Sequence, residues 1–193
     1  MQIKLYLLYL LLLFPLLFPA SDATAQRNRE PYTGNNRVLL ALDGYAGRYQ
    51  FISEQVLVRY NKDLQQLECV VPVETLVPLH DSIPQNMAYE VLFGAVYPQL
   101  YITLAAPVQQ INAGSLSPET RRLSAAVRIQ DVTDDTVVPV SFVPENNSFH
   151  FSTTFDLNLE NFQASIPVAY VPLLTGRLLI TVDRAHWIDL KRR

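Results

Sequence analysis

The chain has 193 residues, of which 49% are hydrophobic and 17% are charged, and its formal net charge is −3. Its basic residues form no cluster apart from Lys191, Arg192 and Arg193, so we expect no nucleic-acid partner. Cys69 is the only cysteine, which excludes an internal disulfide. The hydrophobic core must therefore hold the fold without a covalent cross-link.

The N-terminus has the features of a secretory signal peptide. Lys4 precedes an apolar run from Leu5 to Phe18, and Ala23-Thr24-Ala25 offers a small-residue cleavage site. The run is shorter than the roughly 20 residues that a membrane-spanning helix needs. We predict that residues 1–25 are a signal peptide cleaved after Ala25, that the mature chain has no membrane span, and that it is periplasmic or secreted in a bacterial cell envelope. An uncleaved N-terminal anchor is the alternative.

The next segment, residues 26–46, is predicted to be an N-terminal lead-in. Its first part is polar and contains Pro31, Gly34, Asn35 and Asn36, which are typical of a flexible or loosely tethered segment. We expect the remainder, residues 47–193, to form one domain, because a chain of this size can bury a single sizeable core.

Within that domain, apolar and polar residues alternate in several short runs separated by turn-forming residues. A period of two places successive side chains on opposite faces of a strand. The runs lie at 56–60, 67–73, 100–104, 123–129, 138–142, 149–159 and 178–182, and the predicted turns include 61–63, 131–136, 144–147 and 175–176. This pattern predicts an all-β antiparallel meander, closed into a barrel or folded into a sandwich.

One stretch, Leu76 to Val96, lacks this alternation and is predicted to contain a short amphipathic helix. The residues expected on its apolar side are Met87, Val91, Leu92 and Ala95. Pro98 prevents helical continuation and favours an extended Tyr97. We expect the helix to cross one end of the sheet, where it would cover an apolar interior; an ordinary connector packed on the core is the alternative.

Four segments resemble the YceI-like family of exported, lipocalin-like barrels. They are "YNKDLQQLECVVPVETL", "MAYEVLFGAVYPQLYITL", "GSLSPETRRLSAAVRIQDVTDDTVVPVSF" and "FHFSTTFDLNLENFQASIPVAYVPLLTGRLLITVD", which together span most of residues 47–183. The Tyr97-Pro98 pair after the helix is the most specific of these features. The histidines usual in the family's first strands are absent from residues 37–55, so the chain resembles a divergent member.

The resemblance implies an antiparallel barrel of about eight strands with one short helix near one mouth. In the family the hydrophobic cavity can hold an isoprenoid or another amphiphilic lipid, so an apolar, lipid-like ligand is the expected partner, with no cofactor. Residues whose spacing turns them toward a shared interior are the candidates for lining it: Tyr89, Phe93, Tyr97, Leu100, Ile102, Ala125, Val127, Phe149, Phe151 and Phe155. The same residues suit a solid core, so a cell-envelope structural or interaction domain with a filled interior is the alternative function.

Enzymatic activity has little support in the sequence. The three histidines, His80, His150 and His186, are far apart, and a base such as His80 beside Asp81 in a loop is more often simply solvated. No serine lies in a G-x-S-x-G motif. We therefore expect a protein that is not an enzyme.

The remaining reactive or metal-binding residue types also have ordinary interpretations. Cys69 alternates with apolar residues and is expected to be a buried, inert thiol. Asp131, Asp134 and Asp135 form a turn cluster whose spacing differs from that of a calcium-binding loop. No histidine pair has metal-ligand spacing, so we expect no metal site.

Overall fold

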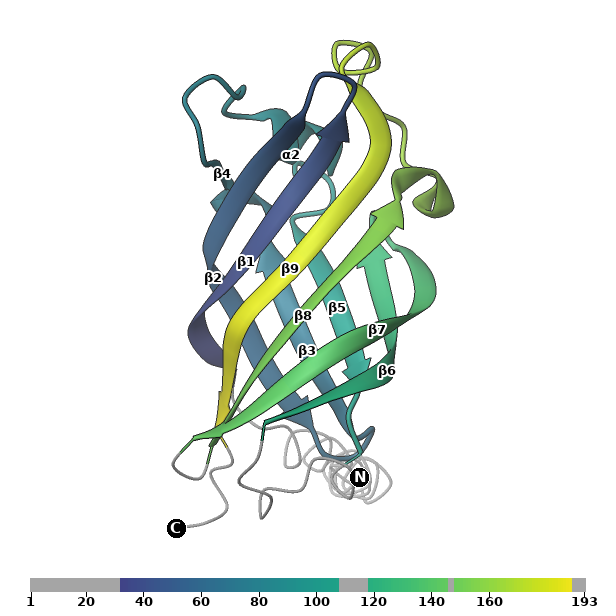
Figure 1. Cartoon of the computed structure of the whole chain (residues 1–193). Coiled ribbons are helices and arrows are strands. Elements are labelled where there is room, and N and C mark those ends of the chain that lie inside the picture. Colours follow the sequence, from purple (N-terminus) through teal and green to yellow (C-terminus); the bar gives the residue numbers. More distant parts are fainter. Residues whose placement is uncertain (1–31, 108–117, 146–147, 189–193) are drawn as a thin grey trace, which may run out of the picture.

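The computed structural model describes residues 32–107, 118–145 and 148–188, and in them the chain is almost entirely β (Figure 1). The strands are β1 (Thr33–Gly44), β2 (Arg48–Asn61), β3 (Gln66–Pro72), β4 (Val77–Pro78), β5 (Gln99–Ala105), β6 (Glu119–Ile129), β7 (Val132–Glu145), β8 (Ser148–Asn158) and β9 (Leu174–Ile188). The helical elements are the 3-10 helices η3 (Val73–Thr75) and η4 (Leu159–Phe162) and the α-helix α2 (Met87–Val91). The predicted signal peptide and its cleavage site lie outside the described residues.

The strands form one closed antiparallel ring. Their order is β1-β9-β8-β7-β6-β5-β3-β2, and pairing of β1 with β2 closes it. Leu40 lies at the junction, because it is in register with Phe51 of β2 and with Ile180 of β9. The two-residue strand β4 adds to β2 outside this ring. The predicted barrel of about eight antiparallel strands is therefore confirmed.

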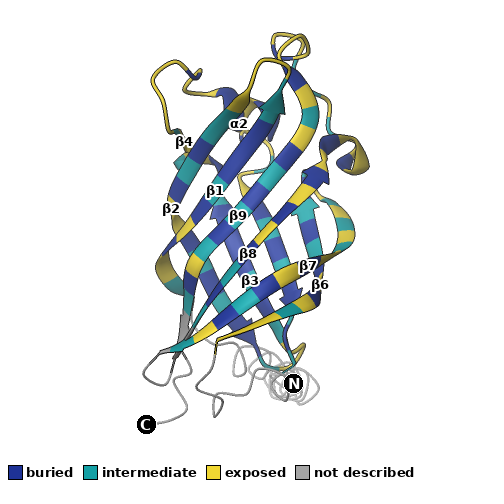
Figure 2. Cartoon of the chain, viewed as in Figure 1, coloured by how far each residue is buried: buried dark blue, intermediate teal, exposed yellow. Residues whose placement is uncertain are grey.

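Strict alternation produces the division between interior and surface. Along β5, for example, Leu100, Ile102 and Leu104 are buried, whereas Tyr101 and Thr103 between them are partly exposed. Figure 2 shows the same banding of buried and exposed residues along the other strands. Because each strand contributes one apolar face to the same enclosed space, the chain needs no second layer to build a core.

The first strand lies where a lead-in is predicted. Residues 33–44 form β1, whose Val38, Leu40 and Leu42 are each 1% exposed. The polar residues at its start hide the alternation that follows. Leu39 and Ala41, which lie between the buried residues where polar side chains are expected, are also apolar and weaken the pattern further. The predicted domain boundary at residue 47 therefore falls inside the first hairpin, and this divergent N-terminal segment completes the barrel.

Helical elements and turns gather at one end of the barrel, which we call the lidded end (Figure 1). Backbone hydrogen bonds join Tyr45 of the β1–β2 turn to Leu173 and join Leu79 to Gln50 at this end. The β6–β7 turn reaches α2 there as well, since the Gln130 amide donates to the Val91 carbonyl at 3.3 Å. None of the helices in the described part of the chain is long and apolar enough to cross a membrane.

Candidate functional site

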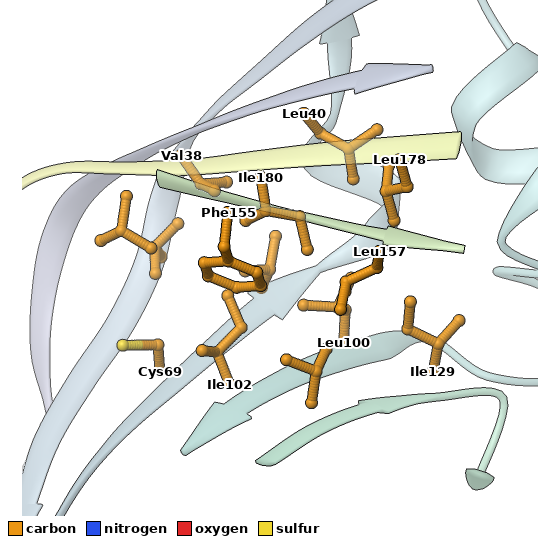
Figure 3. Packing of buried hydrophobic residues seen from close by; sticks show 14 of the residues in the cluster. Val38, Leu40, Cys69, Leu100, Ile102, Ile129, Phe155, Leu157, Leu178 and Ile180 are labelled. Atoms are coloured by element: carbon orange, nitrogen blue, oxygen red, sulfur yellow. The ribbon is translucent and has the colours of Figure 1, made fainter. Parts of the chain in front are cut away.

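The barrel interior is the candidate site. Side chains from the ring strands meet there in one continuous cluster (Figure 3). The cluster is apolar, and its members include Val38, Leu40, Phe51, Val58, Cys69, Leu100, Ile102, Ile129, Phe155, Leu157, Leu178 and Ile180. Such a lining offers apolar contacts but few polar groups to fix or activate a substrate.

Six of the ten predicted lining residues lie in this interior. Leu100, Ile102, Ala125, Val127, Phe151 and Phe155 are all at most 7% exposed and belong to the cluster. Phe149 is a residue of β8 in register with Trp187, but its side chain lies outside the described set. The sequence prediction missed large fully buried residues, namely Phe51, Tyr60 and Phe162, of which Phe51 and Tyr60 belong to an alternating strand.

The three aromatic residues predicted from helical spacing do not face the interior. Tyr89 is 37% exposed, Phe93 is 38% exposed and Tyr97 is partly buried. The reason is that α2 ends at Val91, so a four-residue spacing no longer defines one face beyond it. Ala95 is likewise exposed, against the prediction that it lies on the apolar side.

The core side of α2 and its C-cap is formed by Met87, Val91 and Leu92, as predicted, together with Ala88, and all four are at most 2% exposed. The helix terminates in a Schellman motif: Gly94 N–H donates to the Tyr89 carbonyl at 2.8 Å and Phe93 N–H to the Glu90 carbonyl at 3.2 Å. Phe93 occupies the left-handed position with φ of 54°, where glycine is usual. A short helix therefore covers the mouth of the barrel, as predicted, although it is shorter than the sequence suggests.

The segment before β9 fastens this helix through one polar contact. The Tyr170 hydroxyl donates to Glu90 Oε2 at 2.8 Å, and the ring of Tyr170 is 9% exposed. Burial and then this hydrogen bond raise the pKa of Tyr170 above its ordinary value. The tyrosine hydroxyl therefore keeps the proton that it donates in the neutral range.

Toward the opposite end, polar side chains join neighbouring strands of the ring. Asn36, 3% exposed, donates from Nδ2 to the Val56 carbonyl at 3.1 Å and accepts the His186 N–H at 2.6 Å. The Tyr60 hydroxyl donates to the Ala106 carbonyl at 2.9 Å. These bonds tie β1 to β2 and β9, and β2 to the end of β5.

Two strand ladders are incomplete, and a hollow lies at each. The ladder between β5 and β6 stops at Leu104 and Ala125, beside an outer hollow of about 420 Å³. The ladder between β7 and β8 stops at Val140 and Thr153, beside a second hollow of about 400 Å³, which we call the β7–β8 hollow. The latter is lined by Asp134, Asp135, Thr136, Asp156, Leu157, Asn158, Asn161 and Arg177.

This arrangement corrects the prediction for residues 131–136. The turn consists of Gln130 and Asp131, both with positive φ as in a two-residue hairpin, and β7 begins immediately at Val132. Asp134 and Thr136 thus belong to a strand, in register with Val127 and Ala125, so they occupy inward positions. Their polar character on an inward face is the signal that marks the β7–β8 hollow.

The residue types that carry catalysis are not assembled in the described residues. His80 and Asp81 are exposed in a loop, while His150 stacks on His186 with ring centroids 5.0 Å apart at the surface of β8 and β9. Burial, and to a smaller extent Glu68, raises the pKa of Cys69 to about 12, so this thiol is protonated and enclosed. No group of three or more His, Cys, Asp or Glu residues within 32–107, 118–145 and 148–188 is placed to hold a metal ion.

The ring, its apolar interior and its helix-covered mouth define the class as a lipocalin-like antiparallel barrel. Among solved structures, the chain is similar to a polyisoprenoid-binding domain from Saccharophagus degradans implicated in plant cell wall breakdown, with a TM-score of 0.66 and 7% identity over 78% of this chain and 93% of that one. It is also similar to BcnA of Burkholderia cenocepacia, with a TM-score of 0.55 and 12% identity over 77% and 94% of the two chains.

A Campylobacter jejuni YceI protein matches with a TM-score of 0.49 and 10% identity, over 68% of this chain and 78% of that one. No family model matches the sequence, and no curated protein matches it. The chain therefore shares the barrel fold of the polyisoprenoid-binding domain and of BcnA at very low sequence identity. This is the fold that the resemblance to the YceI-like family implies, so that expectation is confirmed.

Proposed function

We propose that this chain is an exported barrel that binds or carries an apolar or amphiphilic ligand, such as an isoprenoid lipid, without chemical conversion. The observation that carries the proposal is the single continuous apolar interior whose mouth is covered by α2. The polyisoprenoid-binding name of one structural neighbour supports the same class of ligand.

The driving force would be transfer of apolar ligand surface out of water. Each Å² of that surface contributes about 25 cal/mol before the costs of association and ordering are subtracted. Interior positions such as Leu100, Ile102 and Phe155 offer apolar contacts of this kind and no ionic group. Binding should therefore depend on hydrocarbon length more than on salt.

The proposal is tested by identifying what the protein retains. The chain is expressed with its leader and purified without detergent, and its organic extract is analysed by mass spectrometry. A second exported protein of similar size, purified in parallel, is the control for carried-over membrane lipid. We expect a discrete lipid enriched over the control and saturable fluorescence of the neutral apolar probe N-phenyl-1-naphthylamine. An empty extract together with no probe binding would contradict the proposal.

Export is tested separately from binding. N-terminal sequencing of the purified mature protein should begin at Gln26, and fractionation should place it in the periplasm or the medium. A chain that keeps residues 1–25 and remains with the cells would contradict export while leaving ligand binding open to its own test.

The second candidate is a cell-envelope interaction domain with a filled core. It is favoured by the large side chains that are completely enclosed, since Phe51 and Tyr60 are 0% exposed and Phe151 is 1% exposed. If this second function is correct, the melting temperature of the protein should be the same with and without an apolar ligand. A ligand that binds only the folded barrel must raise that temperature by mass action.

A further inference from the structure

The wall of the barrel parts between β7 and β8 beside the lidded end. β7 remains paired with β6 as far as Val132, and β8 remains paired with β9 as far as Asn158, but the two strands separate above Val140 and Thr153 (Figure 1). The next residue of β7 is Pro139, which has no N–H to continue a ladder. Its carbonyl accepts the Thr153 hydroxyl at 2.8 Å instead, and the pairing ends there.

The register shows how deep this opening reaches. If the antiparallel pairing of Val140 with Thr153 continued along both strands, four residues farther on it would place Thr136 opposite Leu157. Instead, both residues line the β7–β8 hollow. Thr136 is in register with buried Ala125, and Leu157 is a core residue with 5% exposure. The hollow therefore extends from solvent to side chains that face the interior.

The outer part of this hollow is polar and carries an excess of negative charge. Its lining includes three aspartates and one arginine, which gives a formal charge of −2. Arg177 is already paired with Asp156 at 2.9 Å. Thr136, Asn158 and Asn161 add a hydroxyl and two amides. This composition suits hydroxyl, carbonyl or ammonium groups and opposes phosphate and carboxylate groups.

We propose that the β7–β8 hollow holds the polar head of an amphiphile whose hydrocarbon tail lies in the barrel, and that the tail passes through this opening. The head is neutral or cationic. This inference rests on the proposed function and adds to it the path of the ligand and the charge class of its head group.

A side-chain hydrogen bond spans the opening. Asn161 of η4 donates from Nδ2 to Asp134 Oδ2 at 3.0 Å, between two solvent-exposed groups. Such a bond contributes little net stability, so it can break at low cost while Leu159 and Phe162, each 1% exposed, keep η4 anchored in the core. The corresponding contact across the lidded mouth is the one between Tyr170 and Glu90. The two contacts provide one site each for an engineered cross-link.

The test compares two cross-linked variants in a Cys69→Ala background, each joined by a flexible bismaleimide, because the hydrogen bonds join the ends of long side chains and a disulfide needs Cα atoms within about 7 Å of each other. One variant combines Asp134→Cys with Asn161→Cys, and the other combines Glu90→Cys with Tyr170→Cys. Cross-linking of the first should slow release of bound N-phenyl-1-naphthylamine by about tenfold or more relative to the same variant without the linker, whereas cross-linking of the second should change it by less than about twofold. The reverse result would place the path at the mouth and overturn the inference. Thiol titration verifies each cross-link.

A second pair of variants needs no cross-link. Thr136→Trp fills the hollow, while Thr133→Trp adds the same ring to an exposed position of β7. We expect slower probe exchange in the first variant and wild-type exchange in the second. Equal exchange in both, with both variants folded by circular dichroism, would overturn the inference.

The head-group charge is tested by competition against the same probe. An alkylamine, an alkanol and a fatty acid of equal chain length are compared at low ionic strength, and the first two should compete at least about fivefold better than the carboxylate. Asp135→Asn should reduce that difference. Equal or better competition by the fatty acid would overturn the assignment of charge. If neither the wild-type protein nor any variant binds any of these compounds, the proposed function itself fails. If binding is unchanged and the exchange rate is unaffected by the cross-links and by Thr136→Trp, only the proposed path through the opening fails.

Discussion

Replacing Gly94 by alanine tests how α2 is held over the mouth of the barrel. A Cβ built on Gly94 would lie 2.4 Å from both Cδ2 and Cε2 of Tyr89 and 3.1 Å from its Cγ. Ordinary van der Waals contact begins at 3.4 Å, so the aromatic ring must move by about 1 Å, the difference between these distances. Because the near atoms include Cγ, which lies on the axis of ring rotation, turning the ring about the Cβ–Cγ bond does not relieve the clash.

The expected cost of Gly94→Ala is about 1–3 kcal/mol in the free energy of unfolding, as for other overpacked contacts. In a Tyr89→Ala background the obstruction is gone. Gly94 is not among the glycines with positive φ, so its backbone accepts alanine. The same substitution should then be neutral or stabilising by up to about 1 kcal/mol, because alanine restricts the unfolded chain.

The assay is a double-mutant cycle of urea-induced unfolding followed by circular dichroism. Gly34→Ala is the control, because a Cβ on Gly34 has nothing within 4 Å and should change stability by less than about 0.5 kcal/mol. An equal cost of Gly94→Ala with tyrosine and with alanine at position 89 would refute the reasoning. Tyr89 would then have no part in holding the end of α2.

Three further predictions concern the wall and the core. Ala125→Trp should lower the free energy of unfolding by about 1–3 kcal/mol and weaken probe binding, because position 125 faces the core. Ala126→Trp, on the outward face beside the outer hollow, should change that free energy by less than about 0.5 kcal/mol. Equal losses for the two variants in urea unfolding would contradict the assigned faces. Burial raises the pKa of Cys69 to about 12 from 9.0, so its contribution to stability is fully present below pH 9 and is lost as the pH rises toward 12. Relative to Cys69→Ala, the free energy of unfolding of the wild type should therefore fall by about 4 kcal/mol across this window. Native Cys69 should not react with a thiol reagent at pH 8. Asn36→Ala should cost about 1–3 kcal/mol in thermal or urea unfolding, because it removes a buried side chain that accepts the partly buried His186 N–H. A loss below about 0.5 kcal/mol, the usual scatter of surface substitutions, would contradict this role.

The sequence predicts the barrel well because period-two alternation is a local property that survives along much of each long strand after β1. Pro98 also marks its boundary correctly: its carbonyl accepts the Val73 N–H at 2.9 Å, which anchors the chain as it enters β5. β1 is missed because polar residues precede its apolar face. Its assignment depends on partners far along the chain, β2 and β9, which no local pattern reveals.

The errors around α2 have a different cause. Spacing of four assigns Tyr89, Phe93 and Tyr97 to one face only while the helix continues, and nothing local indicates that Phe93 will take a left-handed conformation. Tertiary contacts decide the matter, because Met87, Val91 and Leu92 already fill the side that faces the core. The aromatic residues are left outside, where the ring of Tyr89 packs on Gly94.

The inward positions of β7 give the chain its clearest departure from a purely structural pattern. Val138, Val140 and Phe142 are apolar and buried where β8 pairs with β7 or has just left it, but farther along the same face Thr136 and Asp134 are polar and half-buried. A barrel selected only for stability would continue the apolar face and extend the ladder, because a carboxylate directed toward the core is costly unless it is solvated. Departures of this kind tend to mark functional sites. The parted strands supply the solvation, so the polar residues and the gap in the ladder explain each other, and together they argue for an opening rather than a sealed wall.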